Sequence, residues 1–158
     1  MTVKGSDRSL WLSALALLAA ILGVAVYKAL PLLRPEPVLS APLDPTCDLR
    51  SGPCEARFPG GGVLTFEILP RPIPVLAPLS VRVEARGLEP LGAEVDFAGV
   101  DMNMGFNRVP LTAAGAGRFE GQGMLPTCVR HRMVWDAKVL LETPAGLLAA
   151  PFRFETTR

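Results

Sequence analysis

Two short segments of the chain carry side chains that bind soft metal ions. Met102 and Met104 are two residues apart, and so are His131 and Met133, with Cys128 shortly before them. In an extended chain, residues i and i+2 point to the same side, so each segment would present a pair of ligands on one face. Thioether and thiolate sulfur select Cu(I), and imidazole also binds Cu(II). The sequence therefore predicts a copper site made by Met102, Met104, Cys128, His131 and Met133.

The same residues also have ordinary structural explanations. Methionine at strand spacing often fills gaps in a hydrophobic core, so packing of Met102 and Met104 is an alternative to copper contact. His131 stands between Arg130 and Arg132, a setting that fits an exposed surface position with no metal nearby. Both interpretations of each segment stay open at the level of sequence.

The chain has three cysteines, which allow at most one internal disulfide. Cys47 and Cys54 flank Ser51-Gly52-Pro53, a turn signal, so they can approach each other and are our first choice of pair. Pairing of either one with Cys128 remains an alternative, and Cys128 could also stay a free ligand. The six-residue gap between Cys47 and Cys54 differs from the two-residue gap of thioredoxin-type motifs. A structural disulfide is therefore favoured over a redox or metal role.

Other kinds of chemistry find little support in the sequence. There is no Gly-rich phosphate loop and no set of nucleophile, histidine and acid. A single histidine is poor for zinc, and no carboxylate cluster suits Ca²⁺ or Mg²⁺. The net charge of +1 gives no reason to expect a nucleic-acid partner. We therefore predict a protein that is not an enzyme and does not bind nucleic acid.

An apolar stretch near the N-terminus is long enough for a membrane. Residues 10–27 carry no charge, and the apolar character resumes after Lys28 up to Leu33. As a helix, residues 10–33 would be about 36 Å long, enough to cross a bilayer core of about 30 Å. Trp11 and Tyr27 lie near its two ends, where aromatic rings favour the membrane interface. We predict a cytoplasmic tail (1–9) and a transmembrane helix (10–33).

A cleaved signal peptide is the main alternative to a retained anchor. Its apolar core would be shorter and would be followed by a small-x-small cleavage site, whereas residues 26–29 read Val-Tyr-Lys-Ala. The short tail before the span and the cysteines after it favour an orientation with the C-terminal domain outside the cytoplasm. We therefore expect a single-pass protein of the bacterial inner membrane with its domain in the periplasm.

A proline-rich segment separates the predicted helix from the rest of the chain. Residues 34–45 read RPEPVLSAPLDP, which predicts an extended, semi-rigid spacer. Together with the cysteine loop, this spacer makes up residues 34–57. From residue 58 onward helical periodicity is absent and turn signals recur, so we predict a β domain over residues 58–158.

The predicted β domain carries about seven short strands at regular spacing. Clean alternation in residues 79–85 and 93–100 predicts half-buried strands. Pro110 places residues 107–112 at a sheet edge, and residues 143–146 read Thr-Pro-Ala-Gly, a hairpin turn. The other predicted strands are 63–69, 118–125, 132–142 and 147–155. The pattern fits a mainly β fold, an immunoglobulin-like antiparallel β-sandwich, with core aromatics at Phe97, Phe119, Trp135, Phe152 and Phe154.

The order of three segments resembles a known family. PLSVRVEARGLEPLGAEVDFAG (78–99) is followed by the Met-rich VDMNMGFNRVPLT (100–112) and by GAGRFEGQGMLP (115–126), with a tryptophan-containing strand near the end. This arrangement behind an N-terminal anchor resembles the YtkA-like and FixH-like exported β domains. Asn103 and Asn107 stand where that family carries a histidine near the methionines. The resemblance implies a copper-associated protein that supplies copper to, or helps to assemble, a haem-copper cytochrome oxidase.

A second, shorter resemblance concerns residues 131–133. Their His-x-Met pattern is similar to the end of the copper site in periplasmic copper chaperones. We therefore expect Cu(I) as the cofactor, and a membrane protein complex such as cytochrome oxidase, or another copper chaperone, as the partner. The alternative is a single-span accessory subunit without metal, whose β domain docks on a membrane complex. A thiol-disulfide helper that uses the three cysteines is a third hypothesis.

Overall fold

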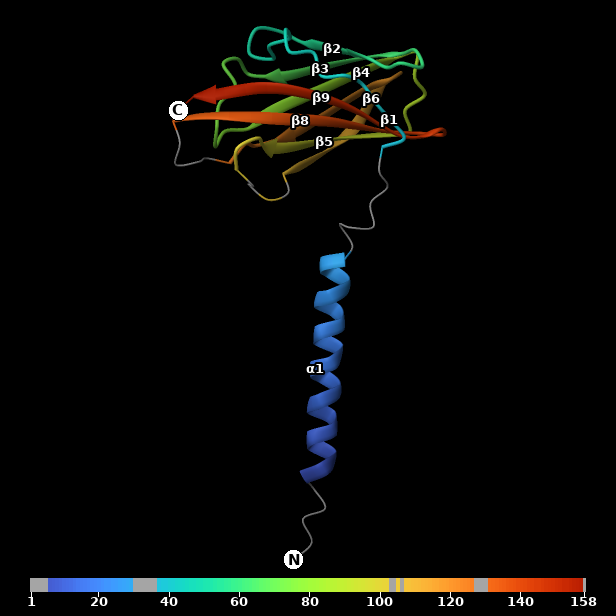
Figure 1. Cartoon of the computed structure of the whole chain (residues 1–158), viewed down its shortest axis with the longest axis vertical. Helices are drawn as coiled ribbons and strands as arrows, with labels where there is room; N and C mark the ends of the chain where they lie inside the picture. The colour runs from blue at the N-terminus through green and yellow to red at the C-terminus, as the bar shows by residue number, and fades with distance from the viewer. Residues whose placement is uncertain (1–5, 30–36, 103–104, 106, 127–130, 158) are drawn as a thin grey trace, which may run out of the picture. The chain divides into compact units, whose positions relative to one another are not determined.

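A computed structural model describes residues 6–29, 37–102, 105, 107–126 and 131–157. The chain divides into two compact units, Met1–Glu36 and Pro37–Arg158. The first unit contains one helix and the second contains all the described strands (Figure 1). This arrangement confirms the prediction of a mainly β protein with a single apolar helix near its N-terminus.

Helix α1 spans Ser6–Ala29, and at 24 residues it is about 36 Å long. Within it, residues 10–28 are long and apolar enough to cross a membrane, and none of them is buried in the protein. A helix that is apolar on all sides is typical of a membrane span, and a signal sequence shares these features. The helix begins four residues earlier than predicted. Residues 30–33 of the predicted span lie outside the described residues.

Nine strands of the second unit form one sheet in the order β1-β9-β8-β5-β6-β7-β4-β3-β2. Neighbouring strands pair antiparallel, with the exception of the parallel pair β1–β9. The strands are β1 (Leu39–Ser40), β2 (Cys54–Arg57), β3 (Val63–Leu69), β4 (Leu79–Arg86), β5 (Gly92–Gly99), β6 (Arg108–Gly115), β7 (Arg118–Gly123), β8 (Arg132–Thr143) and β9 (Gly146–Thr157).

Strand β6 connects the two halves of this sheet. Its first half pairs with β5, with Val109 opposite Val95, and its second half pairs with β7, with Ala113 opposite Phe119. The prediction that Pro110 marks an edge strand was therefore wrong. Pro110 lies in the half of β6 whose ladder runs only to β5, so its missing N–H falls where no second ladder needs a donor.

The two halves of the sheet face each other across the core. The ring of Phe66 on β3 lies 5.0 Å from the ring of Phe152 on β9, although the two strands are far apart in the sheet order. The orders β3-β4-β7-β6 and β5-β8-β9 are those of the two sheets in immunoglobulin-type domains. Here β6 takes part in both ladders, so one continuous sheet curves over on itself where two separate sheets were expected.

Alternation along the strands buries one face of each half. In β4, Val81 and Val83 are buried, while Arg82 and Glu84, which alternate with them, are exposed. All five aromatic side chains predicted for the core are at most 5% exposed, which confirms that prediction: Phe97, Phe119, Trp135, Phe152 and Phe154.

The compact β unit begins earlier than the strand pattern predicted. It starts at Pro37, within the segment predicted as a spacer. There, the N–H of Val38 donates to the carbonyl oxygen of Leu147 at 2.7 Å, and that of Ala41 donates to Ala149 at 2.8 Å. Part of the proline-rich segment is thus fixed against β9 as strand β1. A strand of two residues has no periodicity that a sequence could reveal.

Candidate functional site

Three connections between strands lie together at one end of the β domain: residues 70–78, 100–107 and 124–131. We call this end the loop end. Residues 103, 104, 106 and 127–130 lie outside the described residues. The N–H of Leu76 donates to the carbonyl oxygen of Leu125 at 2.9 Å. The side-chain amide of Asn107 donates to the carbonyl oxygen of Met124 at 3.2 Å. Both neighbouring connections are therefore hydrogen-bonded to the start of 124–131.

Met102 lies at the loop end in a bend that follows β5. The N–H of Val100 donates to the carbonyl oxygen of Val134 at 3.0 Å, so pairing with β8 continues one residue past the end of β5. This bond directs the bend of Asp101 and Met102 toward the start of β8. The side chain of Met102 is half-buried there. Such a position is compatible with both core packing and contact with a metal ion.

His131 and Met133 do not share one accessible face. His131 precedes β8 and is exposed, whereas Met133 is only 9% exposed and belongs to the core together with Trp135. The difference arises because β8 begins at Arg132, so the regular alternation applies to Met133 and not to His131. The structure therefore favours core packing for Met133 and leaves His131 accessible.

The remaining two predicted ligands, Met104 and Cys128, lie outside the described residues. Among the residues that are described, no group of three or more His, Cys, Asp or Glu side chains is arranged to hold a metal ion. A copper site at the loop end would accordingly depend on thioether sulfur, with His131 as the single described imidazole.

Met124 is a thioether that the sequence did not assign to the site. Its side chain is 52% exposed, while the next residue, Leu125, is completely buried and fixes the chain at this point. Asn107 holds the Met124 carbonyl from the neighbouring connection. The sequence did mark this position as the end of a strand. Met124 lies near the end of the predicted strand 118–125, and Leu125 and Pro126 follow it.

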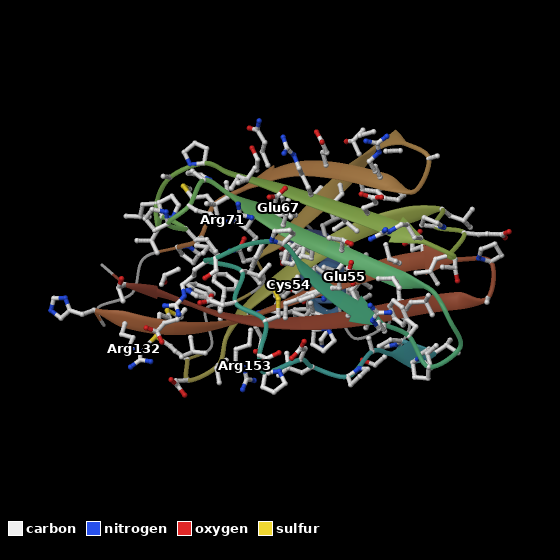
Figure 2. The ribbon with its side chains drawn as sticks, turned by 90° about the horizontal axis from the view of Figure 1, so that it is seen from above. Cys54, Glu55, Glu67, Arg71, Arg132 and Arg153 are labelled. Atoms are coloured by element: carbon white, nitrogen blue, oxygen red, sulfur yellow. A yellow bond between two sulfur atoms is a disulfide. The ribbon has the colours of Figure 1, made fainter. Side chains whose placement is uncertain are left out.

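Two ion pairs lie on the outer face of β8 and β9. Arg153 donates to Asp136 through two nitrogens, at 2.7 and 2.9 Å, and Arg132 pairs with Glu155. The two labelled arginines are seen in Figure 2. The hydrogen bonds that Arg153 donates to Asp136, and then the charges of Asp136 and Asp101, raise the pKa of Arg153.

A shallow hollow of about 340 Å³ lies on the outer face of β3, β4 and β7. Its charged side chains alternate in sign and pair with one another. Arg82 lies 3.7 Å from Glu67 and 3.4 Å from Glu120. Glu67 also pairs with Arg71 outside the hollow at 2.8 Å, and both residues are labelled in Figure 2. Exposed pairs of this kind add at most about 1 kcal/mol each. We interpret this hollow as a solvated sheet face and assign no function to it.

Cys47 and Cys54 form a disulfide, with their Cα atoms 5.8 Å apart. This confirms the pair that was our first choice. Between the two cysteines, Leu49 is completely buried, and its carbonyl oxygen accepts a hydrogen bond from Nε of Arg71 at 3.4 Å. The disulfide thus closes a loop that places an apolar side chain in the core, which agrees with a structural role.

Comparison with known proteins adds no relative to this chain: no protein-family model, curated protein or solved structure matches it. The resemblance to YtkA-like and FixH-like domains therefore stays a prediction from the sequence.

Proposed function

We propose that this protein is a membrane-anchored accessory protein of the periplasm that binds Cu(I) at the loop end. We further propose that it delivers copper to a haem-copper respiratory oxidase, or helps to assemble one. The observation that carries the proposal is the meeting of two methionine-bearing connections, 100–107 and 124–131, at one end of a β domain.

The donor types at this end support a soft metal. Met102 and Met124 supply thioethers, and His131 supplies an accessible imidazole. Met104 and Cys128 belong to the same two connections and remain predicted ligands. Thioether and thiolate ligands favour Cu(I) over Zn²⁺, Ca²⁺ or Mg²⁺. Met133 is omitted from this ligand set because it is buried in the core.

The location of the site fits transfer to a partner. The chain joins the β unit at Pro37 and runs beside the start of β9. The loop end lies at the start of β8, which pairs with the last residues of β9. Donors at the far end of these strands would lie away from this point of entry, where a protein that accepts or supplies copper could approach them.

The helix and the disulfide support the proposed location. Helix α1 is long and apolar enough to anchor the protein in the inner membrane. The disulfide between Cys47 and Cys54 suits an oxidising compartment such as the periplasm. A retained α1 would hold the β domain on that side of the membrane.

Competition with a chromophoric Cu(I) chelator tests the metal proposal directly. The full chain in detergent is titrated without oxygen and with ascorbate, which keeps copper reduced and leaves the disulfide intact. We expect stoichiometric binding that weakens by about tenfold or more in Met102→Leu and in His131→Asn, because each removes one ligand and keeps a similar volume. A wild-type protein that does not compete with the chelator would exclude the copper function.

A second function is favoured by apolar side chains at the loop end. Leu76 is 59% exposed, Met124 is 52% exposed and Val100 is 42% exposed. Leu76 also has a backbone φ of 55°, a conformation that bulky residues rarely adopt outside functional or tight turns. These side chains could dock on a membrane protein complex without metal. Co-purification that is lost in Leu76→Glu, in a protein indifferent to Cu(I), would support this second function.

A further inference from the structure

The end of the β domain opposite the loop end carries exposed aliphatic side chains around the β8–β9 hairpin. The N–H of Leu91 donates to the carbonyl oxygen of Glu142 at 2.7 Å, on one side of this hairpin. On its other side, the N–H of Val38 donates to Leu147 at 2.7 Å. Leu91 is 72% exposed and Val38 is 71% exposed. Both side chains are therefore mostly open to solvent.

The tip of the hairpin between them is also uncharged. Pro144 and Ala145 are exposed, and the side chain of Val38 lies close over Gly146. We call this set the hairpin end: Val38, Leu91, Pro144 and Ala145. Leu91 precedes β5 and Val38 precedes β1. These strands are the outer two of the four in the order β5-β8-β9-β1, so the two residues are about 14 Å apart across the sheet.

The hairpin end is also where the chain arrives from helix α1. Only seven residues, 30–36, separate Ala29 from Pro37. A chain of this length spans at most about 28 Å when fully extended. The hairpin end therefore stays within reach of any bilayer that α1 spans. Within the β domain, the loop end lies farther from Pro37 than the hairpin end does, because β8 alone, with 12 residues, is about 36 Å long.

We propose that the hairpin end contacts the lipid headgroup layer of the bilayer that α1 spans. This inference rests on the membrane anchor of the proposed function. Glu89 and Glu142 are exposed beside Leu91, and their carboxylates would stay in water. The contact is therefore shallow, with Leu91 and Val38 at the boundary between headgroups and acyl chains. It would present the loop end, with its copper ligands, away from the membrane surface.

Tryptophan quenching by lipids with brominated acyl chains tests this contact in the full chain reconstituted into vesicles. Native Trp11 lies in α1 and reports the anchor, while Trp135 is completely buried in the β core and gives a constant background. Two variants in a Trp11→Phe background report the domain ends: Leu91→Trp at the hairpin end and Leu76→Trp at the loop end. Both replaced leucines are exposed, so the fold tolerates the change.

We expect Trp11 to be quenched, and the added tryptophan of Leu91→Trp to lose at least about twofold more emission than that of Leu76→Trp, because only the first reaches the interface. Equal quenching of the two variants with Trp11 quenched would overturn the contact and leave the anchor intact. A Trp11 that is not quenched would overturn the anchor, and the contact with it. A hairpin end that instead binds a second copy or another protein would give the equal-quenching result.

Discussion

The indole N–H of Trp135 donates a hydrogen bond of 2.9 Å to Oγ1 of Thr156. Trp135 is completely buried on β8, and Thr156 on β9 is 4% exposed. Thr156 is the one buried polar residue in the part of the chain that the structure describes. The bond satisfies the indole donor inside the core, which an apolar neighbour could not do.

Replacing Thr156 by valine should destabilise the β domain by about 1–3 kcal/mol, because the buried indole N–H would lose its acceptor while the volume stays the same. Thr156→Ser keeps the hydroxyl and is the matched control. It should lose less, since only a methyl group is removed. Urea unfolding followed by Trp135 fluorescence in a Trp11→Phe background measures both. A serine variant less stable than the valine variant would contradict the role of the hydrogen bond.

Reduction of the disulfide should lower the free energy of unfolding by about 2 kcal/mol, because it releases a loop with a sequence separation of 7 between Cys47 and Cys54. The reduced loop would also hold buried Leu49 less firmly. Urea unfolding with and without a dithiol reductant measures the difference. Cys128→Ser should show the same difference as the wild type. An equal stability of oxidised and reduced protein would show that the disulfide does not support the loop.

The same loop should give the protein part of its acid sensitivity. Nε and Nη2 of Arg50 donate to the carboxylate of Asp48, each at 2.9 Å, and these hydrogen bonds lower the pKa of Asp48. A carboxyl whose pKa is lowered on folding stabilises the protein fully above its unfolded pKa of about 4. That contribution is lost as the pH falls through the lower folded value.

Asp48→Asn removes this contribution, so wild type and variant should differ most in stability above about pH 4 and converge below it. The difference will be small, under about 1 kcal/mol, because the pair is at the surface. Urea unfolding at several pH values between neutral and acidic conditions measures it. In an Arg50→Gln background the same substitution should have less effect. A difference that does not change with pH would rule out the pairing as its cause.

Strand positions with clear alternation could be predicted from the sequence to within a residue or two. Residues 79–85 were predicted and β4 spans Leu79–Arg86. Strand β2, at Cys54–Arg57, was not predicted, because four residues next to a turn do not show a period. The path of β6 could not be predicted either. Pro110 forbids a second ladder at its own position and gives no sign that a ladder to β7 begins at Thr112.

At the candidate site, residues with the same i, i+2 spacing in the sequence differ in how exposed their side chains are. Met102 and His131 each belong to an i, i+2 pair in the sequence, but both lie just beyond the end of a strand. Alternation applies only inside the strand, as it does for Met133. The end of a strand depends on tertiary pairing, such as the bond from Val100 to Val134, which no local pattern reveals. Contact between 100–107 and 124–131 is likewise a property of the fold.

Variants of Met133 distinguish a role in metal binding from a role in core packing. Since it is 9% exposed and packs in the core, Met133→Ala should destabilise the domain by about 2–5 kcal/mol. Met133→Leu conserves the volume and should cost less than about 1.5 kcal/mol. It should also bind Cu(I) as the wild type does, in contrast to Met102→Leu. A Met133→Leu protein that keeps its stability but loses Cu(I) affinity would return Met133 to the ligand set, and would require the start of β8 to open when copper binds.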